Sequence, residues 1–249
     1  MKVLCWNVNG LLRCIDKGFH KVIKEQEPDI ICLQETKSKS AADLVELDNY
    51  KKYYNFANRN GLWGVAIFTK TEPLDIIKWK DDREGRVLIA EFKDFYLINL
   101  YVMNSGTGLK RLDERLEWDV ELRKYIKSLK KKVIVCGDMN VVHKDIDIWK
   151  KKMDKKVAGC SDEERKSFSK LLDECHLIDM FRYLYPDDLG YSYYSIYLKN
   201  WNPDKGWRLD YVLTTDKTLI KDVKTLPEHY RLSDHIPLTF EILNKENKL

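Results

Sequence analysis

The chain has 249 residues, of which 44% are hydrophobic and 34% are charged, and its formal net charge at pH 7 is +4. A chain of this length and hydrophobic content can build one large domain with a sizeable core. The high charged fraction, and the lack of any apolar run near the roughly 20 residues that cross a bilayer, exclude a membrane protein. The small positive charge indicates an anionic partner only weakly.

Two local features bear on the compartment. The apolar run at the N-terminus is interrupted by Asn7, so it is too short and too polar for a secretory signal peptide. No CxxC pair is present, which argues against a zinc or thioredoxin-like site. Cys5, Cys32 and Cys136 stand in apolar runs, where free cysteine behaves as a small hydrophobe. We therefore expect an intracellular protein, cytoplasmic in a prokaryote and nuclear in a eukaryote.

Hydrophobic periodicity predicts the elements in chain order. It predicts strands at residues 3–8, 29–33, 64–69, 87–92, 96–102, 133–136, 210–214 and 237–242, and helices at 17–27, 112–129 and 161–175. Strands that follow one another with few helices between them favour sheets with antiparallel pairs packed face to face. No linker, repeat or low-complexity segment interrupts the chain. We predict one domain over residues 1–249, with a frayed tail at about 244–249.

Polar side chains stand at one end of six apolar strands. They are Asn7 and Asn9, then Glu35, Asn104, Asp138 and Asn140, Asp210, and finally Asp234 with His235. Any one of them could be an ordinary turn former or cap. Six such ends together predict that these side chains converge in one polar basin.

The residue types of this basin limit its chemistry. Carboxylate and amide oxygens without cysteine suit a hard cation such as Mg²⁺ or Mn²⁺. A histidine beside a carboxylate suits acid–base work or phosphate binding. The sequence has no GxxxxGK[ST] phosphate loop and no GxSxG elbow. Metal-assisted hydrolysis of a phosphodiester fits these residue types best.

Six motifs carry a resemblance to a known family. In chain order they are WNVNG (6–10), PDIICLQETK (28–37), GRVLIAEF (85–92), CGDMNVVHKDID (136–147), GWRLDYVL (206–213) and SDHIPL (233–238). Together they resemble the exonuclease III family of abasic-site (AP) endonucleases, within the endonuclease/exonuclease/phosphatase superfamily, over about residues 2–243. The resemblance implies a four-layered α/β sandwich, with two packed mixed β-sheets flanked by helices, as in deoxyribonuclease I.

The resemblance also implies roles for individual residues. It implies that Glu35 is the principal metal ligand, with Asn9 and Asp234 nearby, and that Asp138 activates water. Asn7 and Asn140 would hold this carboxylate and the phosphate, and His235, oriented by Asp210, would contact the phosphate. Tyr101 and Asn104 would bind the phosphate, and Tyr193, Trp207 and Leu209 would wall the lesion pocket.

Some positions depart from the family pattern. Gly61-Leu62-Trp63-Gly64 stands where the family often has GYSG, and Leu11-Leu12-Arg13 displaces the arginine of a GLR segment. Asn9 stands where some relatives have Asp. These changes spare the catalytic positions and affect the grip on DNA, where we expect contacts from Arg13 and Trp63. The lysine runs at 130–132 and 150–152 are expected to add nonspecific phosphate contacts.

The expected activity is Mg²⁺-dependent hydrolysis of the phosphodiester 5′ to an abasic site in duplex DNA, with Mn²⁺ able to substitute. This cleavage leaves a 3′-hydroxyl and is accompanied by 3′→5′ exonuclease or 3′-trimming activity. The protein is expected to be a monomer. One alternative is a related nuclease that acts on uracil-containing DNA or RNA. Another is a catalytically silent nucleic-acid-binding member, against which the joint presence of Glu35, Asp138, Asn140, Asp210 and His235 argues.

Overall fold

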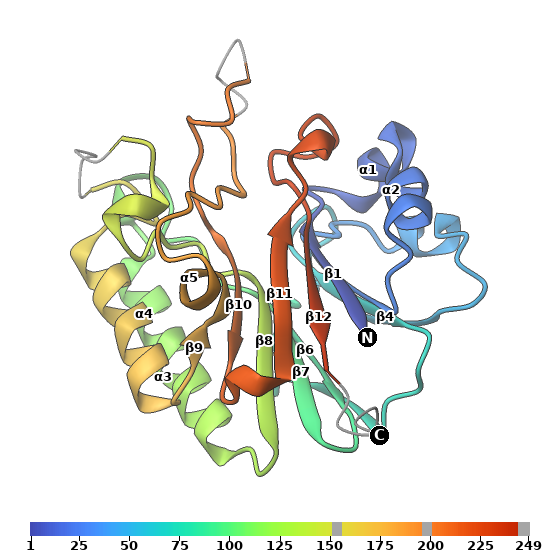
Figure 1. Ribbon diagram of the computed structural model, residues 1–249, viewed down its shortest axis with the longest axis horizontal. Helices are drawn as coiled ribbons and strands as arrows, with labels where there is room; N and C mark the ends of the chain where they lie inside the picture. The colour runs from blue at the N-terminus through green and yellow to red at the C-terminus, as the bar shows by residue number, and fades with distance from the viewer. Residues whose placement is uncertain (151–155, 196–200, 244–249) are drawn as a thin grey trace.

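Two six-stranded mixed β-sheets face each other in the computed structural model, which describes residues 1–150, 156–195 and 201–243 (Figure 1). In spatial order, the first sheet contains β11 (Ile220–Thr225), β12 (Leu238–Ile242), β1 (Lys2–Asn7), β2 (Ile30–Gln34), β4 (Val65–Thr69) and β3 (Lys51–Asn55). The second contains β5 (Asp75–Lys78), β6 (Val87–Glu91), β7 (Phe95–Tyr101), β8 (Lys132–Asp138), β10 (Asp210–Thr214) and β9 (Ile178–Asp179).

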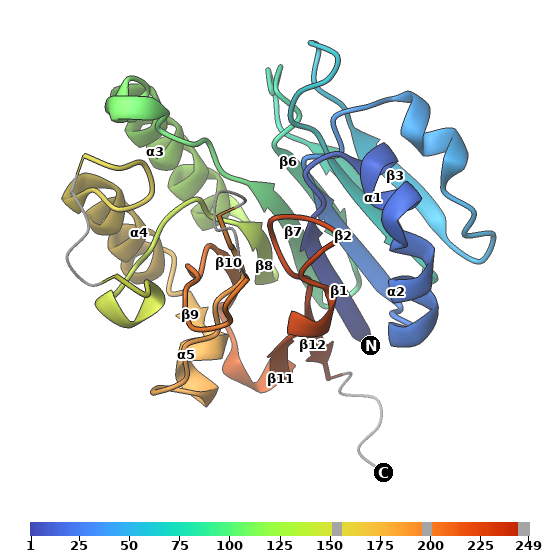
Figure 2. The same ribbon diagram turned by 90° about the horizontal axis from the view of Figure 1, so that it is seen from above.

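Helices cover the outer faces of both sheets. The short helices α1 (Leu11–Lys17) and α2 (Phe19–Gln26) lie on the first sheet, and α3 (Leu112–Ser128) and α4 (Asp162–Glu174) lie on the second (Figure 2). Helix α5 (Met180–Leu184) packs beside β10 and β11. This arrangement confirms the predicted four-layered sandwich.

Strand β1 shows how a period of two builds this sandwich. Val3 and Cys5 join the apolar core between the two sheets, whereas Leu4 and Trp6 join the core under α1 and α2. Successive side chains of a strand point to opposite faces, so a strand between two apolar layers needs an unbroken hydrophobic run. Burial of such side chains contributes roughly 25 cal/mol per Å² of apolar surface.

The helix predicted over residues 17–27 is present as α2, which begins two residues later, at Phe19. Helix α1, which precedes it, was missed. The two are separate because Gly18 adopts φ 125° and its N–H bonds back to the carbonyls of Cys14 and Ile15. The edge strands β3, β5, β9 and β11 and the short helix α5 were missed, since their sequences are short or only half buried.

Further predictions concern the cap of α4, the cysteines and the number of domains. Ser161 caps α4 as predicted, because its Oγ accepts from the Glu164 N–H at 3.2 Å and Glu164 Oε2 accepts from the Ser161 N–H at 3.1 Å. All six cysteines are free and buried. Within the described part of the chain no helix is long and apolar enough to cross a membrane. The single domain stays a prediction, and the tail at 244–249 lies outside the described residues.

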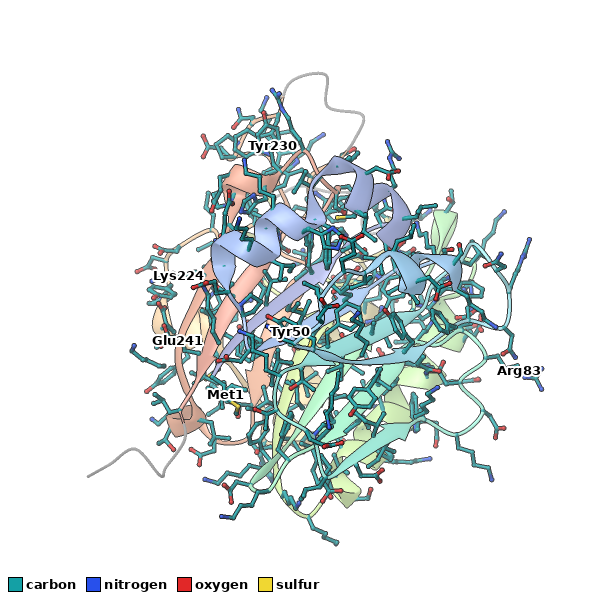
Figure 3. All side chains as sticks on the ribbon, turned by 90° about the vertical axis from the view of Figure 1, so that its right-hand side faces the viewer. Met1, Tyr50, Arg83, Lys224, Tyr230 and Glu241 are labelled. Atoms are coloured by element: carbon teal, nitrogen blue, oxygen red, sulfur yellow. The ribbon has the colours of Figure 1, made fainter. Side chains whose placement is uncertain are left out.

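Each sheet contains one parallel pair, β1 with β2 and β7 with β8. The carboxyl ends of parallel partners lie at the same edge, so the residues that end these four strands gather at one end of the sandwich. Tyr230 stands at this end and Met1 lies away from it (Figure 3). Strand β10 runs antiparallel to β8 and therefore brings its first residue, Asp210, to the same edge, opposite Asp138.

Candidate active site

A cleft of about 570 Å³ opens at this edge of the sandwich. Its walls come from the ends of β7 and β8, from the residue after β2, from the loops that follow β7 and β8, and from the loops that precede β10 and β12. It is lined by Glu35, Tyr101, Asn104, Asp138, Asn140, Tyr193, Trp207, Leu209, Asp234 and His235, with Trp149 and Lys205 among the others. The predicted convergence of strand ends is thus seen in the structure.

Asp138 lies at the centre of the hydrogen-bond network. Its Oδ2 accepts from Nδ2 of Asn7 at 2.9 Å, and its Oδ1 accepts from the backbone N–H of Asn140 at 2.8 Å. Nε2 of His235 lies 3.7 Å from the same Oδ2. Burial raises the pKa of the Asp138 carboxyl to about 7, against the lowering effect of His235. This carboxylate is therefore suited to accept a proton near neutral pH.

Asp210 and His235 form a buried acid–imidazole pair. Nδ1 of His235 lies 2.7 Å from Oδ2 of Asp210, and both side chains are almost fully buried. Burial alone would lower the pKa of His235, but the Asp210 and Asp138 carboxylates outweigh it and raise the pKa to about 10. His235 is then an imidazolium at neutral pH that donates Nδ1–H to Asp210. Its Nε2–H remains available to an anion in the cleft.

Glu35 and Asn9 meet at the ammonium of Lys37. Nζ of Lys37 lies 2.8 Å from Oε2 of Glu35 and also bonds to Oδ1 of Asn9. Nδ2 of Asn7 donates to Oε1 of Glu35 at 3.0 Å. Burial would raise the pKa of Glu35, yet Lys37 and Asn7 lower it overall. The predicted metal-ligand position is therefore an ionised carboxylate, and Lys37, which we assigned no role from the sequence, is its cation.

The oxygens of this corner fit a hard divalent cation. Glu35 and Asn9 already direct oxygens at one positive charge, and carboxylate and amide oxygens are ligands that Mg²⁺ accepts. Asp234 lines the same cleft, with its Oδ1 bonded to Oγ of Ser233 at 3.2 Å. Among the described residues no set of three His, Cys, Asp or Glu side chains forms a ready metal cluster. Glu35 would thus be the main anionic ligand of a cation bound there.

Tyr101 ends β7 with its ring against a buried cation. The guanidinium of Arg86 lies 4.7 Å from the Tyr101 ring centroid and 5.3 Å from that of Trp63, so this cation contacts both rings. Burial and the charges of Glu35 and Asp138 hold the pKa of Tyr101 well above its usual value. Its phenol is a neutral hydrogen-bond donor.

The backbone adopts sparsely populated conformations at this site. Asn9, Glu35 and Asn140 have φ values of 45°, 53° and 47°. Left-handed φ angles in residues other than glycine cost energy and cluster at functional sites. Asn140 is held by Nδ2–H···O=C to Val102 at 2.8 Å, and its Oδ1 accepts from Nδ2 of Asn104 at 2.9 Å. The fold thus holds these polar side chains in place before any substrate arrives.

An aromatic wall closes one side of the cleft. Tyr193 lies with its ring centroid 5.1 Å from His235 and 5.9 Å from Trp207, and bridges of the β type join it to both. Leu209 is buried beside them. The three residues predicted to wall the lesion pocket are therefore together and adjacent to His235.

Two predicted contact residues lie outside the cleft. Trp63 packs on Arg86. Arg13 lines a second hollow of about 330 Å³, whose lining also includes Lys17, Arg231, Asn9 and Asp234. Arg13 is exposed and has no hydrogen bond or ion pair with the described residues. The second hollow adjoins the cleft, since Asp234 lines both.

The lysine run at 130–132 does not face the site. It immediately precedes and enters β8, whereas the cleft lies at the other end of that strand. Lys131 pairs with Glu91 at 2.5 Å, and Lys132 pairs with Asp216. The nonspecific phosphate contacts expected from this run stay a prediction, which its place away from the cleft does not support, and residues 151–152 of the second run lie outside the described residues.

A buried acid–imidazole pair, a second carboxylate and a hard-cation corner on a two-sheet sandwich define a phosphoester hydrolase. A model of the Endonuclease/Exonuclease/phosphatase family matches residues 4–235. The chain belongs to this family, as the motifs indicated.

Relatives in the same family are nucleases by name. The chain is 40% identical over 248 residues to an exodeoxyribonuclease of Bacillus subtilis (strain 168), covering 96% of this chain and 98% of that protein. It is 39% identical over 253 residues to the DNA repair nuclease APEX1 of Danio rerio, with 96% and 81% covered.

Solved structures agree on the fold. The AP endonuclease LMAP from Leishmania major superposes with a TM-score of 0.86 at 27% identity, covering 98% of this chain and 88% of that one. The 3′ phosphatase NExo from Neisseria, bound to a product DNA hairpin, gives 0.87 at 25% identity, with 98% and 100% covered.

Proposed function

We propose that the protein is a DNA repair nuclease that hydrolyses the phosphodiester 5′ to an abasic site in duplex DNA, leaves a 3′-hydroxyl, and also trims 3′ ends. The observation that carries the proposal is the pair of hydrogen bonds from Asn7, which joins Asp138 to Glu35 in one cleft beside the Asp210–His235 pair. The nuclease relatives and the DNA-bound structural neighbour support DNA as the substrate.

The protein's own groups can carry the chemistry. Asp138, with its pKa raised to about 7, accepts the proton of the attacking water. The imidazolium of His235 donates Nε2–H to a non-bridging oxygen as charge builds there. The neutral phenol of Tyr101 and the side-chain amide of Asn104 line the same cleft, while Asn140 keeps its Nδ2–H on the carbonyl of Val102 and so holds its own amide in place. Donors held in place in this way stabilise the transition state without reorganisation.

The cofactor is proposed to be Mg²⁺, with Mn²⁺ able to replace it. Glu35 would hold the ion with Asn9, and Asp234 stands nearby in the cleft lining. When bound, the ion supplies Lewis-acid stabilisation of the phosphoryl and leaving oxygens. Asn7 keeps Glu35 oriented through Oε1, which leaves Oε2, now paired with Lys37, to face a cation.

The substrate preference is argued from the aromatic wall and the second hollow. An abasic nucleotide unstacks at low cost, so it can enter a pocket walled by Tyr193, Trp207 and Leu209. Lys17 and Arg231 stand with Arg13 in the adjoining hollow, and no carboxylate partner is seen for these three cations among the described residues. In our proposal they neutralise backbone phosphates of the DNA beside the lesion. We propose that the enzyme acts as a monomer.

The proposal is tested with a labelled duplex that carries a single abasic analogue. Matched duplexes without the lesion, with uracil, and with a 3′-phosphate end are run beside it, as is single-stranded RNA. Incision at the lesion that needs Mg²⁺ and stops with EDTA is expected. The proposal fails if the abasic duplex stays intact, and a faster reaction on the uracil or RNA substrate would redirect it to that substrate.

A further inference from the structure

Arg208 lies between two residues of the aromatic wall, Trp207 and Leu209, and its own side chain is buried away from the cleft. Its side chain is 2% exposed. Its Nε donates to Oδ1 of Asp147 at 2.8 Å. Its two terminal nitrogens donate to the two carboxylate oxygens of Asp179 at 3.1 and 2.7 Å. The planar guanidinium is thus held on two sides by two carboxylates.

With Arg182 the cluster has four charged side chains, two arginines and two aspartates, whose charges neutralise one another. Arg182 donates to Oδ1 of Asp147 at 2.7 Å, so two arginines face two aspartates. Asp179 also caps α5 by accepting from the Arg182 N–H at 3.2 Å. The ring of Tyr211 lies 4.2 Å from the Arg208 guanidinium. Buried charges are costly when unpaired, so Arg208 has one favourable position, against Asp147 and Asp179.

The same cluster ties two segments of the cleft together. The N–H of Arg208 donates to the carbonyl of Asp147 at 2.8 Å, and that of Trp149 donates to the carbonyl of Gly206 at 3.1 Å. Ile148 and Trp207 form a bridge between these contacts. Trp149 and Trp207 both line the cleft. Movement of Arg208 would therefore move the pocket wall on both segments.

We propose that Arg208 is a positioning residue, fixed by Asp147 and Asp179, that sets the aromatic wall so that the pocket accepts an abasic nucleotide and rejects an intact one. This inference rests on the proposed function. A pocket can reject an intact nucleotide by its shape only if its walls are rigid. A small displacement of positioning groups is costly for binding and catalysis. A bidentate guanidinium between two anions supplies that rigidity, which lysine cannot reproduce.

The test measures binding discrimination in a catalytically silent background, so that it does not depend on turnover. In Asp138→Asn protein with EDTA, the Kd for an abasic-analogue duplex is compared with that for the matched intact duplex. Arg208→Lys keeps the positive charge but loses the planar guanidinium. It is expected to reduce the ratio of the Kd for the intact duplex to the Kd for the abasic duplex by about tenfold or more, since a misplaced positioning group costs up to about 100-fold. Asp179→Asn leaves the hydrogen bond between Arg208 and Asp147 in place and is also expected to reduce the Kd ratio. It replaces Arg208→Lys if that variant melts below the assay temperature.

A double-mutant cycle separates positioning from a general loss of stability. If Arg208 acts through the wall, Arg208→Lys has little further effect on the ratio in a Trp207→Ala background. Asp216→Asn is the matched control, since it breaks an ion pair with Lys132 beyond the far end of β10 and should leave the ratio unchanged.

The outcomes are distinguishable. If the Asp138→Asn reference protein binds both duplexes equally, the proposed lesion preference is contradicted. If the Asp138→Asn reference protein discriminates, and Arg208→Lys or Asp179→Asn added to it leaves the Kd ratio unchanged, the role of Arg208 alone is overturned. Additive effects of Arg208→Lys and Trp207→Ala overturn it as well.

Discussion

Asn7 and Asp138 lie 131 positions apart in the sequence and in different sheets, yet Nδ2 of Asn7 donates to Oδ2 of Asp138 at 2.9 Å. The other Nδ2–H of Asn7 reaches Oε1 of Glu35. One amide therefore sets the distance between the proposed water-activating carboxylate and the proposed cation ligand.

Replacement of this amide should uncouple the two carboxylates. We expect Asn7→Ala to lower kcat for abasic-site incision by roughly 10- to 100-fold, the cost typical of residues that orient a metal ligand, with a smaller change in KM. Steady-state kinetics on the abasic duplex measure this. Asn49→Ala, which changes an exposed asparagine, serves as the control. A full-rate Asn7→Ala enzyme would refute the coupling.

The pH–rate profile should be bell-shaped. Asp138 must be ionised to accept a proton, so kcat/KM rises as pH increases through about 7. His235 must be protonated to donate to the phosphate, so kcat/KM falls as pH increases through about 10. Single-turnover rates from pH 5 to 11 at constant ionic strength check this. Loss of the acidic limb in Asp138→Asn and of the alkaline limb in His235→Asn would assign the two groups, and unchanged limbs would reject the assignment.

Lys37 should compete with the proposed cation. Its ammonium bonds to the oxygens of Glu35 and Asn9 that would bind the ion. Because one elementary charge at this range is worth on the order of 1 kcal/mol or more, Lys37→Met should tighten Mg²⁺ or Mn²⁺ binding roughly tenfold. Isothermal titration calorimetry without DNA gives the Kd, with the exposed Lys39→Met as the control. An unchanged or weaker Kd contradicts competition.

Stability should fall in acid through Asp147. Burial would raise its pKa, but Arg208, Arg182 and a backbone bond lower it below its unfolded value of about 3.9. This stabilisation is complete above that value and is lost as pH falls through the folded pKa. Urea unfolding from pH 2 to 7 measures it. Asp147→Asn should lose roughly 3–5 kcal/mol at neutral pH and show a shallower acid slope, and an identical slope would exclude Asp147 as the cause.

Gly137 should tolerate no side chain. It has φ 137°, and a Cβ there would stand 1.9 Å from the carbonyl oxygen of Leu100 on β7. We expect Gly137→Ala to cost about 3 kcal/mol or more, from strain and overpacking together. Gly106→Ala is the matched control, because Gly106 also has a positive φ but no atom within 4 Å of its Cβ. Equal losses in the two variants, measured by thermal unfolding, would show that backbone strain alone matters.

Much of the fold was predictable because the central strands are apolar on both faces. The run before Asp138 predicted a buried strand, and β8 is that strand. The edge strand β3, with the sequence KKYYN, escaped prediction because its pattern is not apolar and its pairing with β4 supplies the order. The helix predicted at 17–27 is α2, but the seven-residue α1 before it was missed, because so short a helix carries little periodicity.

The site residues were predictable where the strand end itself supplies the group. Glu35, Asp138 and Asp210 each stand at such an end. Arg208 was quoted within a motif without any role, since nothing local signals that Asp147 and Asp179 will pair with it. The DNA contact of Trp63 stays a prediction, and its packing on Arg86 is a contact that nothing local in the sequence signals.

The sequence alone thus determined the chemistry that this protein can place at its strand ends, because apolar runs and the polar residues that end them are local properties. Tertiary structure decided which of these groups form hydrogen bonds or ion pairs with one another. Asn7 joins Glu35 to Asp138, Lys37 lies between Glu35 and Asn9, and Arg208 is held behind the aromatic wall. These contacts depend on register and burial across distant segments, and the energy of a buried charge depends on the partner that the fold brings to it.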